Sequence, residues 1–309
     1  MKKTTIWLPV LLLLLSSCSL GPRQSANMEP VTENTTHEQS IATIEKKASE
    51  EKEATVEKYQ IKEILCERDG LTIYGQAYIP NNENEKHPTV IMGHGFGGTY
   101  RNNEPYAAYL ASQGIAAYIF DFNGGGTASQ SDGNTRDMSV ITEVADMKAV
   151  FEQVKTLDFV DTDHLFLMGE SQGGFVAALL ATQLKNEIAG LMLLYPAFVI
   201  PDDAHKHYGS PSEIPDQVDL WGVPLGSVYY TDVWNIDVYQ EINPYTGDVL
   251  IFHGLQDKLV PVSYSERAVE AYQSATLITY NDADHGFNGK HAEQTSIKMV
   301  EFIKAICAK

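Results

Sequence analysis

Short apolar runs alternate with segments of helical period from Tyr59 to the end of this 309-residue chain. Such alternation is typical of a mostly parallel sheet that helices cover on both faces. The first two runs, 59–67 and 71–79, flank Asp69-Gly70 and predict an antiparallel hairpin. About eight strands are expected in all. The six others contain TVIMGHG (89–95), IAAYIFDF (115–122), HLFLMGES (164–171), IAGLMLLYP (188–196), VLIFHG (249–254) and ATLITY (275–280), with helices near 103–113, 139–156, 172–185, 263–273 and 289–306.

One segment, 197–247, breaks this rhythm. It holds five prolines, two tryptophans and several tyrosines, which makes it too aromatic for a disordered linker. It is also too long for an ordinary connection between elements of one domain. We therefore expect a small cap or lid, inserted into a main domain that spans 59–309.

The N-terminus has the features of a secretory signal, because two lysines precede the apolar run Ile6–Leu15 and small residues follow it. This run is about half as long as a membrane-spanning helix, so a transmembrane segment is the weaker interpretation. Leu15-Ser16-Ser17-Cys18 resembles the lipobox of bacterial lipoproteins, in which the cysteine is lipidated and becomes the mature N-terminus. We predict a signal peptide over 1–17 and a lipid on Cys18, with a plain secretory signal as the alternative.

Residues 18–58 separate this signal from the first strand. They are rich in Ser, Thr, Glu, Lys and Gln, so they bury too little apolar area to offset the entropy lost on ordering. A flexible coil of about 40 residues spans roughly 35 Å, enough to hold a domain clear of a bilayer. The expected location is the bacterial cell envelope, with the protein lipid-anchored to a membrane and facing outside the cytoplasm.

Composition limits the partners. The formal charge is −19, and removal of the two signal-peptide lysines makes the mature chain −21. Because lysine and arginine do not cluster, nucleic acid is not expected as a partner. Apart from Cys18, only Cys66 and Cys307 remain, too few for a disulfide framework, and their pairing is left open. No His/Cys cluster has zinc-ligand spacing, and neither a metal nor an organic cofactor is expected.

Gly169-Glu170-Ser171-Gln172-Gly173 matches G-x-S-x-G, the pattern of a nucleophile elbow. The motif follows an apolar strand and precedes a helix, which is the context that an elbow requires. Its glycines allow the close backbone approach of a sharp strand-to-helix turn. We predict that Ser171 is a nucleophile; the alternative is a glycine turn with a solvated serine.

A serine nucleophile needs a base, and the base needs an acid that orients it. Asp257 follows one predicted strand and His285 the next, so both should lie on loops at the sheet edge that carries Ser171. Asp248 precedes its strand and would emerge at the opposite edge. Asp282 and Asp284 are too near His285 in sequence to be preferred. Asp257 is therefore the expected acid and His285 the expected base.

The developing oxyanion needs preorganised N–H donors. Gln172 directly follows the nucleophile, and the glycine-rich segment 93–98 follows the third strand. We therefore expect the backbone N–H groups of Phe96 and Gln172 to be the oxyanion donors. An inert glycine turn is the alternative for 93–98. His94 is expected to order this loop. The segment 121–126, DFNGGG, lacks the pattern of a phosphate loop and is expected to be a flexible loop.

Taken together, these motifs resemble the α/β-hydrolase fold over residues 59–309. Within that fold the chain is similar to bacterial feruloyl and cinnamoyl esterases, through the stretches GHGFGG, DFNG, GESQGG, YPAFVIPDDA, HGLQDKLVP and DADHGF. The resemblance implies the same nucleophile, acid, base and oxyanion donors as above. It also implies that the insertion 197–247 caps the site, with Asp202 and Tyr229 as contacts for a phenolic ring.

The expected function is a serine carboxylic-ester hydrolase that works through an acyl-enzyme. Its substrates would be hydroxycinnamoyl or other small aromatic and acyl esters, with plant polysaccharides as one source. A peptidase, thioesterase or acyltransferase of the same fold is the first alternative. A non-catalytic surface-binding lipoprotein is the second.

Overall fold

The structure is a computed structural model that describes residues 58–81 and 85–309. The predicted signal peptide, the lipidated Cys18 and all but the last residue of the predicted tether lie outside these ranges. None of the helices within the described ranges is long and apolar enough to cross a membrane.

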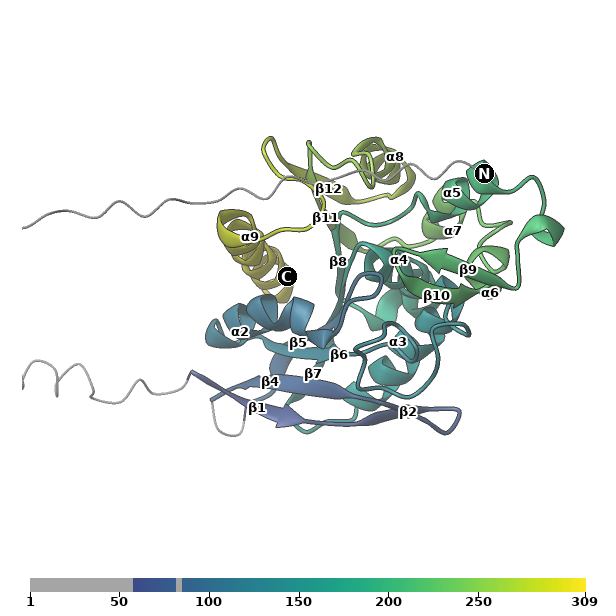
Figure 1. Cartoon of the computed structure of the whole chain (residues 1–309). Helices are drawn as coiled ribbons and strands as arrows, with labels where there is room; N and C mark the ends of the chain where they lie inside the picture. The colour runs from purple at the N-terminus through teal and green to yellow at the C-terminus, as the bar shows by residue number, and fades with distance from the viewer. Residues whose placement is uncertain (1–57, 82–84) are drawn as a thin grey trace, which may run out of the picture. The chain divides into compact units, whose positions relative to one another are not determined.

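An eight-stranded sheet forms the centre of the fold, in the order β1-β4-β6-β5-β7-β8-β11-β12 (Figure 1). β1 pairs with β4, and β4 with β6, in antiparallel fashion; the other neighbours are parallel. The mostly parallel sheet predicted from the apolar runs is confirmed. Its strands are β1 (Tyr59–Glu63), β4 (Gly75–Pro80), β5 (His87–Gly93), β6 (Ala116–Phe120), β7 (Val160–Glu170), β8 (Gly190–Leu194), β11 (Asp248–Gly254) and β12 (Ala275–Tyr280).

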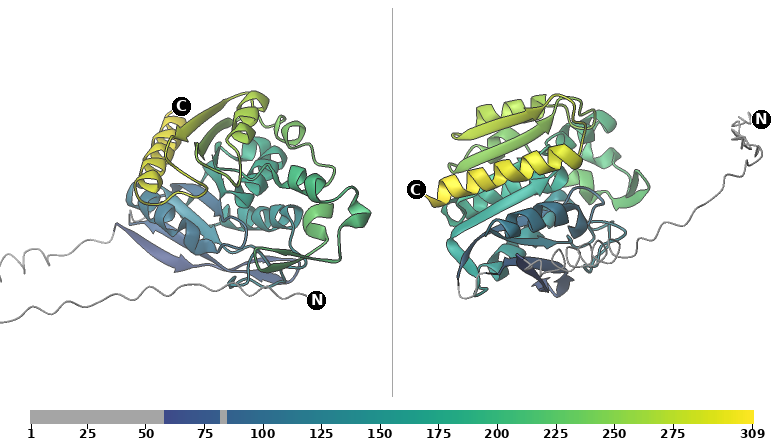
Figure 2. Two further views of the ribbon diagram at one scale, coloured as in Figure 1. Left: turned by 45° about the horizontal axis from the view of Figure 1, so that its top comes forward. Right: turned by 90° about the vertical axis from the view of Figure 1, so that its left-hand side faces the viewer.

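Helices cover both faces of this sheet (Figure 2). Successive side chains of β7 pack alternately into two cores: Leu165 and Leu167 into one, Phe166 and Met168 into the other. Both faces are therefore apolar, which explains why the strands form continuous hydrophobic runs in the sequence. The first core is covered by α3 (Val140–Val154), α4 (Gln172–Leu184) and α8 (Ser263–Ala271), the second by α2 (Glu104–Ser112) and α9 (Gly289–Cys307); η1 (Tyr100–Asn103) and η2 (Lys185–Glu187) are short 3₁₀ turns.

The predicted opening hairpin is present, but each of its arms is divided. β1 pairs with β4 in the main sheet, whereas β2 (Cys66–Arg68) and β3 (Leu71–Ile73) form a separate two-stranded sheet. Asp69 and Gly70 join β2 to β3 with φ of 54° and 82°. Positive φ at both positions is what a type I′ turn requires, and its twist matches that of the right-twisted strands it joins.

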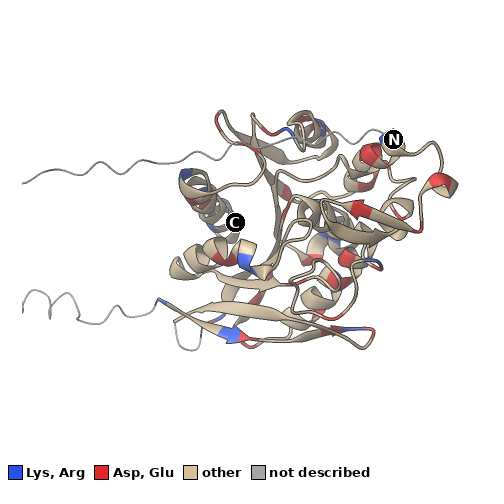
Figure 3. Cartoon of the chain, viewed as in Figure 1, with Lys and Arg blue, Asp and Glu red and all other residues tan. Residues whose placement is uncertain are grey.

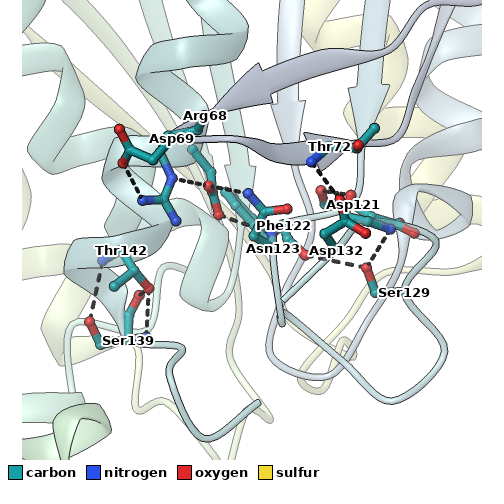
Figure 4. A network of polar contacts seen from close by, with 12 residues as sticks. Arg68, Asp69, Thr72, Asp121, Phe122, Asn123, Ser129, Asp132, Ser139 and Thr142 are labelled. Atoms are coloured by element: carbon teal, nitrogen blue, oxygen red, sulfur yellow. Dashed lines mark hydrogen bonds and ion pairs between the residues drawn. The ribbon is translucent and has the colours of Figure 1, made fainter. Parts of the chain in front are cut away.

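Arg68 ties this small hairpin to the main domain (Figure 4). Its Nε donates to the buried Asp146 of α3 at 2.5 Å. The same carboxylate accepts the backbone N–H and the side-chain amide of Asn123, at 3.0 and 2.9 Å. Segment 121–126 is buried, and a Cβ on Gly126 would lie 3.0 Å from the carbonyl oxygens of Gly97 and Gly98. The expectation of a flexible loop at 121–126 was wrong, because the loop is packed against its neighbours and hydrogen-bonded to them.

Segment 197–247 forms short elements between β8 and β11, seen in green at the right of Figure 1. Its two strands pair only with each other. The elements are α5 (Ile200–His207), η3 (Pro211–Glu213), β9 (Gln217–Leu220), β10 (Val223–Gly226), α6 (Val228–Thr231) and α7 (Val238–Ile242).

Candidate active site

Ser171 occupies the sharp turn between β7 and α4, and its backbone has a φ of 51°. A Cβ on Gly169 would lie 2.0 Å from the carbonyl oxygen of Gly173. A Cβ on Gly173 would lie 2.5 Å from the carbonyl oxygen of His94. Both flanking glycines are therefore sterically required, and the turn holds the serine in a conformation that non-glycine residues rarely adopt.

The structure brings Ser171, His285 and Asp257 into one hydrogen-bonded chain. The Oγ of Ser171 lies 2.9 Å from Nε2 of His285, and Nδ1 of His285 lies 2.7 Å from Oδ2 of Asp257. The three residues follow β7, β12 and β11, whose carboxyl ends meet at one edge of the sheet. Such an arrangement can move a proton from the serine hydroxyl to the imidazole while the carboxylate fixes the tautomer.

Asp257 is held as a carboxylate by several donors. Its Oδ1 accepts the backbone N–H groups of Leu259 and Val260, both at 2.9 Å. Burial acts to raise its pKa, but hydrogen bonds from His253, His285 and Val260 outweigh burial and hold the pKa of Asp257 well below its usual value. The carboxylate is thus charged throughout the neutral range, as an orienting acid must be.

The two expected oxyanion donors lie on either side of Ser171. Gln172 is the first residue of α4, where a backbone N–H has no partner within the helix. Phe96 lies in a turn closed by the N–H of Gly98 and the carbonyl of Gly95 at 3.0 Å. A Cβ on Gly95 would lie 3.1 Å from Cβ of Ser171, so this turn packs directly against the serine. No protein group in the described ranges accepts the N–H of Phe96 or Gln172.

His94 orders the loop that carries Phe96. Its Nε2 accepts the backbone N–H of Phe122 at 3.2 Å, so the proton of the neutral ring lies on Nδ1, which is 2.8 Å from the carbonyl of Gly95. Burial lowers the pKa of His94, which favours this neutral form. The residue is fully engaged in the loop and is not placed to act as a second base.

A cavity of about 540 Å³ opens above Ser171 and His285. The insertion supplies much of its wall, and most of the side chains from that segment are apolar or aromatic. Phe96 packs edge-to-face on Trp221 and on Tyr229, with ring centroids 5.7 and 5.6 Å apart. The acidic and basic side chains in the lining are Glu170, Asp203, His207, Asp219, Lys258 and His285.

Tyr229 lines this cavity, but Asp202 does not. Asp202 is exposed on α5 and accepts a hydrogen bond from the hydroxyl of Tyr264 at 2.6 Å. The next residue, Asp203, lines the cavity instead. The structure thus brings Asp203 to the cavity and does not bring the predicted Asp202 there, because adjacent residues of a helix point about 100° apart.

The side chain of Gln172 joins the insertion to α3, a link that the sequence motif did not indicate. The hydroxyl of Tyr229 donates to Oε1 of Gln172 at 2.8 Å, and Nε2 of Gln172 donates to Oε2 of Glu143 at 2.8 Å. Burial raises the pKa of Glu143 well above its usual value. These contacts fix the amide of Gln172, and with it the first turn of α4.

The two cysteines of the described ranges are unpaired. Cys66 is buried in the core under α3, and Cys307 packs against the core on the opposite face of the sheet. Within the described ranges, no three His, Cys, Asp or Glu residues cluster in a way that could hold a metal ion.

The fold and the site define the class of protein: the chain belongs to the α/β-hydrolases. The serine aminopeptidase S33 family matches residues 84–218. The structure is similar to that of Est1E from Butyrivibrio proteoclasticus with bound ferulic acid, with a TM-score of 0.73 and 31% identity over 80% of this chain and 100% of Est1E.

Among curated proteins, the caffeoylshikimate esterase of Arabidopsis thaliana is 34% identical over 134 residues. That match covers 42% of this chain and 39% of the plant enzyme. The quorum-quenching protein AidA of Acinetobacter baumannii is 30% identical over 28% of each chain. The chain thus spans well under half the length of these curated relatives, and the esterases among the similar proteins support a hydrolase.

Proposed function

We propose that the protein is a serine carboxylic-ester hydrolase. The proposal rests above all on the hydrogen-bonded chain from Ser171 through His285 to Asp257 at the floor of a cavity. Ser171 attacks the ester carbonyl, and its proton passes to Nε2 of His285. His285 then protonates the leaving alcohol, and water releases the acyl group in a second cycle of the same steps. The N–H groups of Phe96 and Gln172 stabilise each tetrahedral oxyanion.

The preferred substrate is a hydroxycinnamoyl ester or another small aromatic ester. An aromatic wall of Phe96, Trp221 and Tyr229 suits a planar ring. Asp203 offers an acceptor to a phenolic hydroxyl, in place of the Asp202 that the sequence suggested. The ferulic acid bound to Est1E supports this choice, since Est1E is similar over its whole length. In this proposal the insertion 197–247 acts as the lid.

The test is Ser171→Ala. Ester hydrolysis should fall by several orders of magnitude, because loss of the nucleophile in a comparable triad costs about 10⁶ in kcat. Circular dichroism of the variant should match that of the wild type, and a fluorophosphonate probe should label the wild type alone. Unchanged hydrolysis of methyl ferulate in the variant would reject the proposal.

A peptidase of the same fold is the second candidate, favoured by the match to the serine aminopeptidase S33 family. Comparison of kcat/KM on methyl ferulate and on a short peptide p-nitroanilide separates the two. We expect the ester to be preferred. A preference for the peptide would assign the same nucleophile to peptide hydrolysis.

A further inference from the structure

Glu170 is a buried carboxyl group directly beside the nucleophile, and the mechanism above leaves it unused. It is the last residue of β7 and is 6% exposed. Its Oε1 accepts the backbone N–H of Gly95 at 3.3 Å, and its Oε2 accepts the hydroxyl of Tyr195 at 2.9 Å. Burying a carboxyl group costs free energy unless it is well paired, so the position of Glu170 beside the nucleophile calls for an explanation.

The two hydrogen bonds of Glu170 connect it to the oxyanion loop and to a side chain that packs against His285. Gly95 precedes the oxyanion donor Phe96 in the turn that packs on Ser171. The ring of Tyr195 packs edge-on against His285, with centroids 4.8 Å apart, and against Phe287 at the same distance. One carboxyl group thus contacts both the loop of the oxyanion donor and a side chain that supports the base.

Charge gives Glu170 a second effect on His285. Burial raises the pKa of Glu170 above its usual value, and the Tyr195 hydroxyl, the Gly95 N–H and the charge of protonated His285 offset only part of that rise. When both groups are charged, the carboxylate of Glu170 and the imidazolium of His285 therefore stabilise each other. Since the site is buried, their attraction is screened less than it would be in water.

Other groups also face this pair. Asp257 accepts from the ring of His285, and Oδ1 of Asp284 accepts its backbone N–H at 2.8 Å. Lys258 lines the same cavity, and the phenol of Tyr106 from α2 interacts electrostatically with Glu170. Glu170, at the end of a different strand from the one that precedes Asp257, is thus a second carboxyl group that interacts electrostatically with His285.

We infer that Glu170 is a positioning residue of the ester hydrolysis proposed above: it holds the oxyanion loop and the base in one arrangement, and its negative charge stabilises His285 once His285 has taken the proton of Ser171. No bond to Glu170 forms or breaks in this step. The proton moves from Oγ of Ser171 to Nε2 of His285, and no proton passes to or from Glu170 in this step. This inference rests on the proposed function.

The experiment is Glu170→Gln, assayed on methyl ferulate across pH. A hydrogen bond to a charged group is worth enough for a loss of roughly 10- to 100-fold in kcat. KM should stay within about twofold. The acid limb of the kcat/KM profile should move to lower pH, because the imidazolium loses a stabilising charge. A purely structural role would lower kcat and leave that limb in place.

Three variants complete the test. Glu170→Asp keeps the charge, so its acid limb should stay near that of the wild type even where the shorter side chain lowers kcat; this variant also serves if the glutamine variant does not fold. Tyr195→Phe removes one bond but keeps the charge, and it too should leave the limb in place. Glu266→Gln removes an exposed carboxylate from α8 and should change neither quantity.

An acid limb that does not move in Glu170→Gln, or that moves equally in Glu170→Asp, would overturn the inference. Full activity in Glu170→Gln would overturn it as well. The Ser171→Ala control separates this outcome from failure of the proposed function. If Ser171→Ala abolishes ester hydrolysis while Glu170→Gln changes neither kcat nor the acid limb, only the role of Glu170 is rejected.

Discussion

Asp202 and Asp203 are adjacent acids on α5 that face different surroundings. Asp203 lines the cavity above Ser171, whereas Asp202 accepts from Tyr264 outside it. The pair offers a matched comparison, because the two substitutions to asparagine remove the same charge from the same helix. Only one of them changes the wall that a substrate ring would meet.

Asp203→Asn should raise KM for methyl ferulate several-fold, because a hydrogen bond to a phenolic hydroxyl loses its charged acceptor. KM for an acetyl ester, which has no such hydroxyl, should change little. Asp202→Asn should leave both values near those of the wild type. Steady-state kinetics of both variants on both esters provide the measurement, and equal effects of Asp203→Asn on the two substrates would contradict ring recognition there.

Glu143 predicts a pH-dependent stability. Burial raises its pKa, so above the ordinary glutamate value of about 4.3 the unfolded chain releases a proton that the folded chain retains. The stability contributed by this group is therefore present at low pH and lost as pH rises through the folded-state pKa. Glu143→Gln does not ionise and avoids that loss.

The free energy of unfolding of Glu143→Gln, relative to the wild type, should thus increase with pH, by at most on the order of 1 kcal/mol per pH unit. Urea titrations between pH 5.5 and 8 measure this difference. Glu301→Gln on the exposed side of α9 serves as the control and should show no such trend. A pH-independent difference for Glu143→Gln would show that the carboxyl group ionises as freely in the folded protein as in the unfolded one.

Residue types and their order located Ser171, Asp257 and His285, because a parallel sheet places the residues that follow its strands at one edge. The sequence indicated Asp202, whereas Asp203 lines the cavity, because residues 200–207 hold too few apolar positions to fix which side of the helix faces inward. Glu143 and Glu170 could not be assigned, because their roles come from contacts with residues distant in sequence, such as Gln172 and Gly95.

At the scale of elements, the strands and long helices follow the predicted ranges because their apolar periods are strong. The opening hairpin differs, since its arms divide where β2 turns toward α3. Long-range contacts hold the divided hairpin, among them the pairing of Arg68 with Asp146, which joins residues 78 positions apart, and the hydrogen bond from Gln153 to the carbonyl of Leu65. The sequence pattern of residues 59–79 alone therefore does not predict where the arms of the hairpin divide.

Arg68→Met tests that contact. The carboxylate of Asp146 is fully buried, whereas the side chain of Arg68 is 20% exposed. Removing the cation should cost about 3 kcal/mol of unfolding free energy, because it leaves a buried charge without its partner. Arg101→Met breaks an exposed pair with Glu104 and should cost less than about 1 kcal/mol. Urea unfolding of both variants gives the comparison, and equal losses would mean that Asp146 needs no cation.

At the scale of the whole molecule, acidic side chains dominate the surface of the insertion. Figure 3 marks positions of acidic residues on α5, near η3 and on β9, and residues 197–247 contain eight Asp or Glu residues and one Lys. This charge disfavours polyanions near the cavity, in agreement with the absence of a basic cluster in the sequence. An acidic domain is also repelled by anionic lipid headgroups, so on its own it would not stay at a bilayer.

The sequence predicts attachment through a lipid on Cys18, and this prediction can be tested because the acidic domain would not by itself hold the protein at an anionic bilayer. Cys18→Ser should move the protein from the membrane fraction to the soluble fraction and leave kcat/KM on soluble esters unchanged, because the hydrolase fold begins at β1. Cys307→Ser, which removes a free thiol from the last helix, should remain with the membrane. Fractionation and immunoblotting measure both variants. A Cys18→Ser protein that stays membrane-bound would rule out the lipid as the anchor, since the acidic domain offers no electrostatic substitute for it.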